Sequence, residues 1–459
     1  MDRTYYLWTI GCQMNEADAR RLAAQLEARG YLPCSLAEQA SVVVLNTCVV
    51  RQQAEDRVLR RLAPLAALKR RKPQTTIAVM GCLVGRREEA SLRDRFPWVD
   101  VFAPPSDLQP LLDHLEEAHE RERERERAVC GEAAAMEPGE EPVLPRSQRD
   151  RAVTAQVPVV LGCSCGCAYC VIPGRRGRER SRPAEEILDE VRRLAEQGVR
   201  EVTLLGQIVD RYGLDRSGSP DLAALLQRVA AVPGLLRVRF LTSHPRWMSD
   251  RLFEAVAESA ILCPCFEVPV QSGNDEVLAR MRRNYTVDEY RRLIGRLRAR
   301  VPNAAIATDI IVGFPGETEA QFMDSFRLIE ELRLDIAHIA RYSERPGTPA
   351  AGLYPDDVPE AEKQRRWAAL EELQTRIQEE ENARLLGGVV DVLAERCEKN
   401  GRWRGRTPQN KLVFFEDDRE PLGRVVPVEL TWTGPFTLIG HAAGRIPEGD
   451  SAASGCAGG

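Results

Sequence analysis

The stretch that organises this chain reads Leu161-Gly162-Cys163-Ser164-Cys165-Gly166-Cys167-Ala168-Tyr169-Cys170. The spacing of Cys163, Cys167 and Cys170 predicts that one loop supplies three thiolates to a single iron-sulfur cluster. A four-iron cluster with three protein ligands leaves one iron open to a substrate or cofactor, whereas electron-transfer clusters normally have four thiolates. The spacing therefore predicts a catalytic cluster.

Two other interpretations of this loop stay open, a zinc knuckle and a set of free thiols. Zinc sites usually combine two short pairs of ligands, and no His follows this loop at ligand spacing. Cys165 lies two residues from both Cys163 and Cys167, too close for all three side chains to point inward comfortably. We therefore interpret Cys165 as a bystander.

Length and composition predict several domains and no membrane segment. At 459 residues the chain is too long for one ordinary core, so we expect about three domains. No apolar run approaches the roughly 20 residues that a membrane-spanning helix needs. The absence of a charged and then apolar leader favours the cytoplasm, where the 13 cysteines would be reduced thiols or metal ligands.

The charge of the chain is unevenly distributed. The formal net charge is −5, which alone would argue against a nucleic acid partner. However, acidic residues gather in 116–126 and 132–141, and basic residues gather in 175–182, 280–283 and 402–411. Because local patches decide phosphate affinity, RNA remains a possible partner, with a solvated face as the alternative for each basic run.

Strands and helices alternate in the first part of the chain. The predicted strands are 5–10, 41–45, 75–80 and 99–102, and the predicted helices are 17–29, 54–70 and 87–95. This alternation predicts a parallel, doubly wound α/β sheet. A charged helix follows in 116–127, and the Pro- and Gly-rich segment 131–145 is predicted to be a linker.

Three further cysteines, Cys12, Cys48 and Cys82, each follow one of these predicted strands. Because the carboxyl ends of parallel strands share one edge of a sheet, these thiols should converge in space. Their convergence predicts a second iron-sulfur cluster. The alternative is that the three side chains pack as small hydrophobic residues, which is common for free Cys.

The middle of the chain contains six predicted strands separated by helices. These strands are 157–161, 201–205, 235–241, 266–270, 305–312 and 335–342. The pattern predicts a partial (β/α)6 barrel whose chemistry lies at the carboxyl ends of its strands. The cysteine loop follows the first of these strands, where a catalytic loop is expected.

The last part of the chain changes to β alternation after a long polar helix in 359–386. The predicted strands are 389–393, 412–415 and 425–430, and they suit a small antiparallel β-barrel of a kind that often binds single-stranded RNA. The Gly-, Ala- and Ser-rich tail is predicted to be disordered, and its Cys456 is not expected to be a cluster ligand.

Taken in order, the motifs of this chain resemble those of the radical S-adenosylmethionine (SAM) methylthiotransferases, and among them the MiaB-type tRNA enzymes. The matching segments are Gly11-Cys12-Gln13-Met14-Asn15, Asn46-Thr47-Cys48, Gly81-Cys82, the three-cysteine loop, Arg176-Gly177-Arg178-Glu179, Ser181-Arg182-Pro183, Val270-Gln271-Ser272-Gly273, Thr308 to Glu317, and Gly405-Arg406-Thr407 with Asn410. The resemblance spans almost the whole chain.

This resemblance implies a three-part enzyme. Its three domains are an N-terminal methylthiotransferase domain (1–128), a radical SAM core (151–382) and a TRAM RNA-binding domain (383–445), with a linker (129–150) and a disordered tail (446–459). The Cys163/Cys167/Cys170 cluster would bind and cleave SAM to a 5′-deoxyadenosyl radical. The Cys12/Cys48/Cys82 cluster would hold the sulfur that becomes the methylthio group.

The implied substrate is N6-isopentenyladenosine at position 37 of tRNA, which would receive the group at C2 after leaving its stack. The anticodon stem-loop would be the partner, a flavodoxin or ferredoxin the electron donor, and the protein a monomer. Two sister reactions stay open, on threonylcarbamoyladenosine in tRNA and on a ribosomal-protein aspartate. A non-catalytic iron-sulfur protein that binds RNA is the third alternative.

The resemblance also implies contacts to SAM and RNA. Four residues in Gly-containing turns at strand ends, Gly206, Gln207, Gly313 and Glu317, would contact SAM, although either turn could be only a turn. Four arginines are candidate substrate or phosphate contacts because a guanidinium offers a two-pronged donor. They are Arg176, Arg182, Arg341 and Arg406.

Some positions differ from the family pattern. Cys265-Phe266-Glu267-Val268 stands where His-Leu-His-Leu is usual, Gln207-Ile208-Val209-Asp210 stands where Gln-Asn-Val-Asn is frequent, and Gly174 replaces a common Tyr. These changes alter the polarity expected near the cofactor. Buried packing is the expected role of Cys263 and Cys265, with an extra metal contact as the alternative.

Overall fold

The computed structural model describes residues 3–49, 52–85, 89–127 and 142–443. The chain divides into two compact units, 1–374 and 375–459, whose boundary falls within helix α13 (Glu360–Ala383). None of the described helices is both long and apolar enough to cross a bilayer. The predicted tail 446–459, with Cys456, lies outside the described residues, as does 129–141 of the predicted linker.

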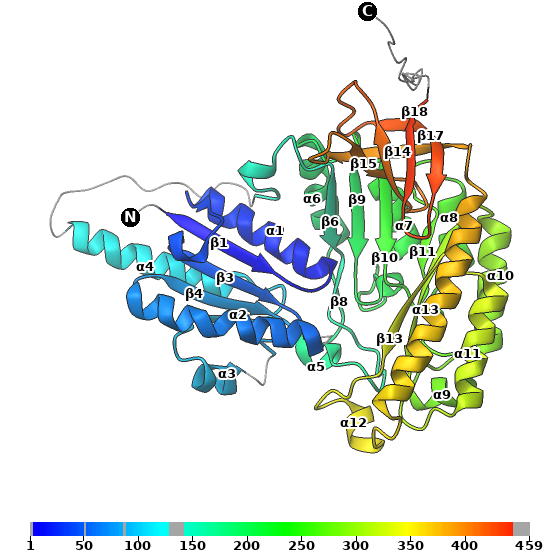
Figure 1. The fold of residues 1–459 in the computed structure, drawn as a ribbon. Helices are drawn as coiled ribbons and strands as arrows, with labels where there is room; N and C mark the ends of the chain where they lie inside the picture. Colours follow the sequence, from blue (N-terminus) through cyan, green and yellow to red (C-terminus); the bar gives the residue numbers. More distant parts are fainter. Residues whose placement is uncertain (1–2, 50–51, 86–88, 128–141, 444–459) are drawn as a thin grey trace, which may run out of the picture. The chain divides into compact units, whose positions relative to one another are not determined.

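The first unit begins with a five-stranded, fully parallel sheet that has helices on both faces (Figure 1). Its strand order is β2 (Leu32–Pro33), β1 (Thr4–Thr9), β3 (Val42–Thr47), β4 (Thr76–Gly81) and β5 (Val101–Ala103). The helices are α1 (Gln13–Ala28), α2 (Gln52–Arg71), α3 (Glu89–Arg95) and α4 (Gln109–Arg127). The predicted doubly wound sheet is confirmed, although the short edge strand β2 was not predicted.

Alternate residues of β3 and β4 face two separate cores. Val43 and Leu45 share one core with Leu62 of α2, whereas Val44 shares the other with Leu22 of α1 and with α4. Successive side chains of a strand point to opposite faces, so a sheet covered on both sides needs apolar residues throughout. Polar and reactive side chains are therefore confined to the ends of these strands.

All six predicted strands of the barrel are present and parallel to their neighbours. They are β6 (Thr154–Pro158), β9 (Glu201–Leu205), β10 (Arg237–Leu241), β11 (Cys265–Glu267), β12 (Ala305–Val312) and β13 (Ile336–Arg341). The surrounding helices are α6 (Ala184–Glu196), α7 (Leu222–Ala230), α8 (Asp250–Ala257), α9 (Asp275–Arg280), α10 (Val287–Arg300), α11 (Glu319–Leu332) and α12 (Pro349–Leu353). The predicted partial barrel is confirmed.

The barrel strands form two three-stranded sheets rather than one continuous sheet. The orders are β10-β9-β6 and β11-β12-β13, linked by an isolated bridge between Val238 and Leu262. Hydrogen bonds flank this bridge, but the next N–H, that of Cys265, donates to the Cys263 carbonyl oxygen at 2.8 Å and not to β10. The chain after Pro264 pairs with β12 instead, which interrupts the ladder.

The predicted strand 157–161 is in fact two strands. β6 ends at Pro158, and β7 (Val160–Leu161) pairs antiparallel with β8 (Arg180–Ser181). This two-stranded ribbon closes the base of the cysteine loop, which also contains the short helix α5 (Ile172–Arg176). The loop is thereby tied to the barrel at both ends.

The second unit is a closed five-stranded barrel with the order β14-β15-β16-β18-β17. Its strands are β14 (Val389–Cys397), β15 (Trp403–Arg406), β16 (Leu412–Glu416), β17 (Val425–Thr433) and β18 (Leu438–Ala442). The predicted small barrel is confirmed, with two differences. β15 and β18 were not predicted, because their short Arg-Gly-Arg and Gly-His sequences lack a clear apolar alternation. The β16–β18 pair is also parallel, so the barrel is not wholly antiparallel.

Candidate functional site

The first group of thiols lies in the loop between β7 and α5. Cys163 and Cys167 are buried, and Cys170 is partly exposed. The backbone N–H of Cys165 donates to Cys163 Sγ at 3.4 Å, and the Cys165 thiol hydrogen-bonds with both Cys163 and Cys167. Cys165 thus lies within the thiol group in this structure, although its predicted role as a bystander stays a prediction.

Arg283 supplies a positive charge beside this group. Its Nη1 donates to Cys167 Sγ at 3.5 Å, its Nη2 to the carbonyl oxygen of Pro269, and its Nε to the hydroxyl of Tyr285. The Arg283 side chain is buried. For this residue, the alternative interpretation of the basic run 280–283 as a solvated face does not hold. A hydrogen bond with Cys165 raises the pKa of Cys167, burial raises it further, and Arg283 opposes the rise.

The second group of thiols lies where β1, β3 and β4 end at the carboxyl edge of the N-terminal sheet. Cys12 immediately precedes α1, and Cys48 and Cys82 follow β3 and β4. The Cys82 N–H donates to the Thr47 carbonyl oxygen at 2.9 Å, and the Cys12 thiol lies 3.7 Å from Asn15 Oδ1. Three adjacent strands therefore bring these cysteines to one edge, as the topology predicted.

Two glycines allow this close approach. A Cβ at Gly11 would lie 2.8 Å from the Cβ of Cys48, and one at Gly81 would lie 2.5 Å from the Thr47 carbonyl oxygen. Both residues also have positive φ, at 139° and 94°. Gly11 and Gly81 thus lie against the end of β3, Asn46-Thr47-Cys48, from both sides, where side chains would push the cysteines apart.

Replacing Gly81 with alanine should destabilise the protein by about 3 kcal/mol, because a strained backbone conformation adds to a clash with backbone. Gly30→Ala is the matched control, since Gly30 also has positive φ (85°) but no heavy atom within 4 Å of its added Cβ. Its expected cost is about 1–2 kcal/mol. Denaturant unfolding of the metal-free protein measures both, and equal losses would contradict the clash.

Arg176 connects the second thiol group to the barrel. It is the last residue of α5, its side chain is 3% exposed, and its Nη2 donates to Asn15 Oδ1 at 3.0 Å. Its Nη1 donates to Ser106 Oγ at 3.1 Å and lies 4.0 Å from Asp18 Oδ2, and the guanidinium interacts electrostatically with Cys82. Burial lowers the pKa of Arg176, but Cys82, Asp18 and Cys12 raise it overall, so the group stays charged.

Asn15 completes this connection. Its Nδ2 donates to the carbonyl oxygens of Ile10 and Thr47, at 3.1 and 2.8 Å, and Asn15 is fully buried. One amide side chain therefore joins the turns that carry Cys12 and Cys48 to Arg176. Burial raises the pKa of Cys82 to about 11, and Arg176 opposes this rise.

The donors of both thiol groups suit iron-sulfur clusters. Each group contains the three predicted cysteine ligands, the first group also contains Cys165, and each has an arginine whose charge favours thiolates. Arg176 Nε has no acceptor among the described residues. No His, Cys, Asp and Glu side chains of the described residues gather tightly enough to hold a single metal ion. A four-iron cluster needs a wider spacing, because each thiolate binds a different iron.

The predicted SAM-contacting residues lie in two turns at the carboxyl ends of barrel strands. Gly206 and Gln207 follow β9, and Gly313 follows β12. The carboxylate of Glu317 accepts the Gly313 N–H at 2.6 Å and pairs with buried Arg366 at 2.9 Å. Glu317 therefore closes its own turn, which fits the interpretation of this segment as a structural turn. The SAM role of the four residues stays a prediction.

The four predicted substrate arginines lie in different surroundings. Arg176 is buried as described, and Arg182 pairs with Glu190 at 2.8 Å. Arg341 pairs with Glu360 and is about one-third exposed. Arg406, in the second unit, donates to the Asn410 carbonyl oxygen at 3.0 Å. Internal partners hold Arg176 and Arg182, whereas Arg341 and Arg406 keep part of their surface in solvent.

Two acidic residues that depart from the family pattern lie at the carboxyl ends of barrel strands. The Asp210 carboxylate accepts the backbone N–H of His244, and Glu267 accepts that of Thr242 at 3.0 Å. Burial raises the pKa of both groups to about 7, and for Glu267 the neighbouring Asp309 adds to the rise. Both carboxyl groups therefore change protonation near neutral pH.

Glu267→Gln should flatten the pH dependence of stability. The pKa of Glu267 is raised from 4.5 to about 7 on folding, so the unfolded chain loses this proton first and stability falls as pH rises through that window. A neutral glutamine removes this loss. The melting temperature of the metal-free variant, measured from pH 5 to 8, should fall less than that of the parent. An unchanged slope in both Glu267→Gln and Asp210→Asn would refute the assignment.

Three family models match successive parts of the chain. Residues 4–104 match a family described as "Uncharacterized protein family UPF0004", 157–329 match the "Radical SAM superfamily", and 383–443 match the "TRAM domain". The N-terminal match contains Cys12, Cys48 and Cys82, and the central match contains the three-cysteine loop. The third match covers the small β-barrel.

Curated relatives match nearly the whole chain. A protein of Roseiflexus sp. (strain RS-1) is 48% identical over 96% of this chain and 90% of its own length. One from Chloroflexus aurantiacus is 47% identical (96% and 91%), and one from Herpetosiphon aurantiacus is 44% identical (96% and 98%). All three are named tRNA-2-methylthio-N(6)-dimethylallyladenosine synthase.

Solved structures show the same fold at low sequence identity. The radical S-adenosylmethionine methyltransferase TsrM of Kitasatospora setae, with cobalamin and a [4Fe-4S] cluster bound, superposes with a TM-score of 0.55 and 17% identity. The match covers 76% of this chain and 77% of that one. At this identity the likeness concerns the fold alone.

Proposed function

The chain belongs to the radical SAM methylthiotransferase family of tRNA-2-methylthio-N(6)-dimethylallyladenosine synthases, and on this basis we propose that it adds a methylthio group to C2 of N6-isopentenyladenosine beside the tRNA anticodon. The observation that carries this proposal is the pair of cysteine groups, one in the loop between the two strands of the β7–β8 ribbon and one at the carboxyl ends of three parallel strands. Membership of the radical SAM superfamily implies one [4Fe-4S] cluster and SAM.

We assign the SAM-binding cluster to Cys163, Cys167 and Cys170, and a second cluster to Cys12, Cys48 and Cys82. When bound, the two clusters and SAM supply the one-electron chemistry and the sulfur for the reaction. The chain's own residues hold and charge-balance these groups. Arg283 donates to Cys167, and the charge of Arg176 interacts with Cys82. Each arginine compensates negative charge on thiolate ligands in a buried site.

Arg176 has a further role in this proposal, as a positioning residue. Its side chain extends from α5, and its guanidinium reaches Asn15 and the surroundings of Cys82 in the second thiol group. A buried charge with several fixed partners tolerates little displacement. Arg176 therefore keeps the two candidate clusters at a constant separation, which transfer of a group from one to the other requires.

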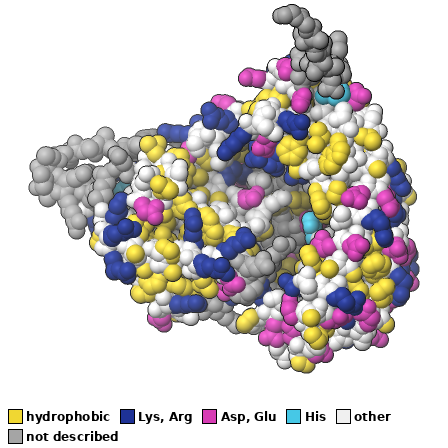
Figure 2. Space-filling model, viewed as in Figure 1, with side chains coloured by type: hydrophobic (Ala, Val, Ile, Leu, Met, Phe, Trp, Pro, Cys, Tyr) yellow, Lys and Arg dark blue, Asp and Glu magenta, His cyan; other side chains and the backbone are white. Residues whose placement is uncertain are grey.

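The RNA-binding role is supported by the TRAM match and by the local charge of the surface. Figure 2 shows Lys and Arg side chains spread over one face of the N-terminal α/β layer, although the net charge of the chain is −5. We further propose tRNA as the macromolecular partner, a flavodoxin or ferredoxin as electron donor, and a monomeric protein. Because tRNA is its substrate, we place the reaction in the cytoplasm.

We propose the division of labour along the chain that the motifs imply. Residues 1–128 would carry the sulfur-donating cluster, 151–382 would carry SAM chemistry, and 383–445 would bind RNA, with 129–150 as the linker. The family matches at 4–104, 157–329 and 383–443 support the order of these parts.

Nucleoside mass spectrometry of tRNA from a deletion strain tests the proposed function. The methylthio form of N6-isopentenyladenosine should disappear, the form without the methylthio group should accumulate, and the reintroduced gene should restore the product. Loss of the methylthio threonylcarbamoyl nucleoside instead would identify the sister enzyme. Unchanged tRNA would remove the assignment to tRNA.

A further inference from the structure

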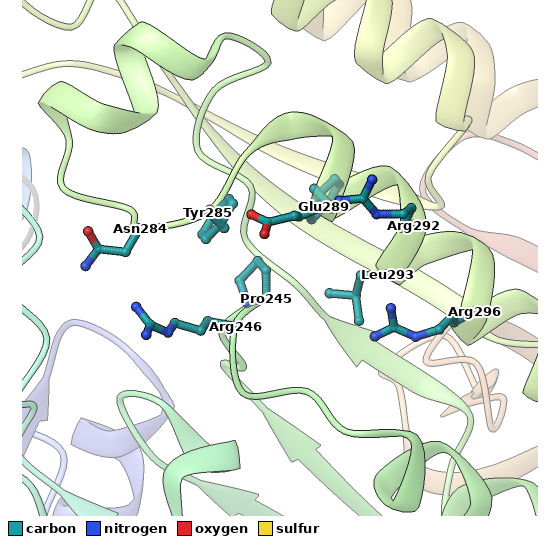
Figure 3. A pocket seen from close by; sticks show the side chains of 9 residues that line it. Pro245, Arg246, Asn284, Tyr285, Glu289, Arg292, Leu293 and Arg296 are labelled. Atoms are coloured by element: carbon teal, nitrogen blue, oxygen red, sulfur yellow. The ribbon is translucent and has the colours of Figure 1, made fainter.

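A pocket of about 520 Å³ lies on the barrel between the loop after β10 and helix α10 (Figure 3). Arg246 comes from the loop, and Arg292 and Arg296 come from α10. All three arginines are exposed to solvent, and we call the pocket that they line the arginine pocket. None of them belongs to the thiol groups or to the predicted substrate contacts.

The charge of this pocket is not balanced. In the part of the chain that the structure describes, neither Arg246 nor Arg292 forms an ion pair, whereas Arg296 pairs with Asp250 at 3.1 Å. Glu289 is the acidic side chain of the lining, and its carboxylate accepts the Thr286 N–H at 2.8 Å in a helix cap. Two guanidinium groups are therefore left to bind an anion.

The pocket borders the first thiol group through two residues. Tyr285 lines the pocket, and its hydroxyl oxygen accepts the Nε–H of Arg283. The Nη1 of the same arginine donates to Cys167. Arg246 follows β10, one of the strands whose carboxyl ends form the functional edge of such a barrel. An anion in the pocket would therefore lie beside the reaction centre. The backbone of a nucleic acid strand that enters the reaction centre would pass the same place.

We infer that the arginine pocket binds backbone phosphates of the tRNA substrate next to the base that enters the barrel. Two arginines on opposite sides of a polar pocket suit consecutive phosphates, which accept paired hydrogen bonds from guanidinium groups. Contacts of this kind fix the register of a strand without reading its sequence. The inference rests on the proposed function, because it takes tRNA as the substrate.

The test uses the anaerobically reconstituted full chain and an anticodon stem-loop carrying N6-isopentenyladenosine. Arg246→Ala/Arg292→Ala should raise the Kd for this RNA by about tenfold or more and the KM in parallel, with kcat changed less than about twofold. The slope of the logarithm of the RNA association constant against the logarithm of salt concentration should become less steep by about 1.4, because two phosphate contacts on a single strand are lost. Formation of 5′-deoxyadenosine without RNA should be unchanged.

Arg192→Ala/Arg228→Ala is the matched control, because it removes two exposed arginines from α6 and α7. It should leave Kd and the salt slope near those of the parent. The inference is overturned if both double variants weaken binding equally, or if the pocket variant keeps the parent slope. It is also overturned if inorganic phosphate inhibits the parent but not the pocket variant while their RNA affinities are equal.

The outcome of this test can be separated from that of the proposed function. If the parent binds the stem-loop but produces no methylthio nucleoside, the proposed reaction fails, and the difference in salt slope still decides the role of the pocket. If the parent modifies the RNA and the pocket variant is unaffected in Kd and KM, the inference about the pocket fails alone.

Discussion

Cys163→Ala should abolish 5′-deoxyadenosine formation and lower the iron content from about eight to about four atoms per chain. Cys163 is one of the three assigned ligands in the cysteine loop, and Cys165 is the fourth thiol of that loop. Without Cys163, the proposed SAM-binding cluster would lose one of its three assigned protein ligands. We expect no methylthio product and a loss of activity of at least about 10⁴-fold, since the cofactor supplies the difficult chemistry.

Cys165→Ala is the matched control for this experiment, because it removes a neighbouring thiol from the same loop. If Cys165 is a bystander, the variant should keep about eight irons and most of its 5′-deoxyadenosine formation. The assignment of the ligands would be wrong if Cys165→Ala lost the cluster and Cys163→Ala kept it. An iron-free, zinc-loaded parent protein would instead support the zinc alternative.

Cys48→Ala should separate the two halves of the reaction. Cys48 is buried at the end of β3, against the backbone of Gly11, and belongs to the second thiol group. The variant should retain about four irons and the cleavage of SAM to 5′-deoxyadenosine. It should form no methylthio nucleoside, because the group that would hold the sulfur is lost.

Cys34→Ala provides the matched control in the same sheet. Cys34 is partly exposed, and its thiol donates to the Tyr5 carbonyl oxygen at 3.4 Å, at the opposite edge from the second thiol group. This variant should keep both iron content and product formation. Full methylthio product from Cys48→Ala, measured by mass spectrometry of the stem-loop, would exclude a second cluster at this position.

The architecture could be predicted because its patterns are local. Fully buried, largely apolar strands such as β3 and β4 and the helices between them have the periodicities of a sheet covered on both faces. The short strands β15 and β18 escaped prediction because closure of a barrel stabilises them, which a local pattern does not reveal. The break after Pro264 likewise depends on which neighbour the following strand finds.

The supporting arginines of the candidate site were harder to predict than its cysteines. Arg283 belongs to a basic run that resembles a solvated face, yet the structure buries it against Cys167. Arg176 is a candidate substrate or phosphate contact from the sequence, and the structure adds that its side chain is buried and donates to Asn15. Arg246 and Arg292 come from segments far apart in the chain, and no local pattern joins them.

The sequence by itself determined the order of the parts and the two sets of cysteines, because strand periodicity and ligand spacing are written in short stretches. Only the tertiary structure decided which charges accompany those cysteines. A guanidinium lies beside Cys82 or Cys167 because helices and turns distant in the chain pack together there, and its burial depends on neighbours that no single stretch contains.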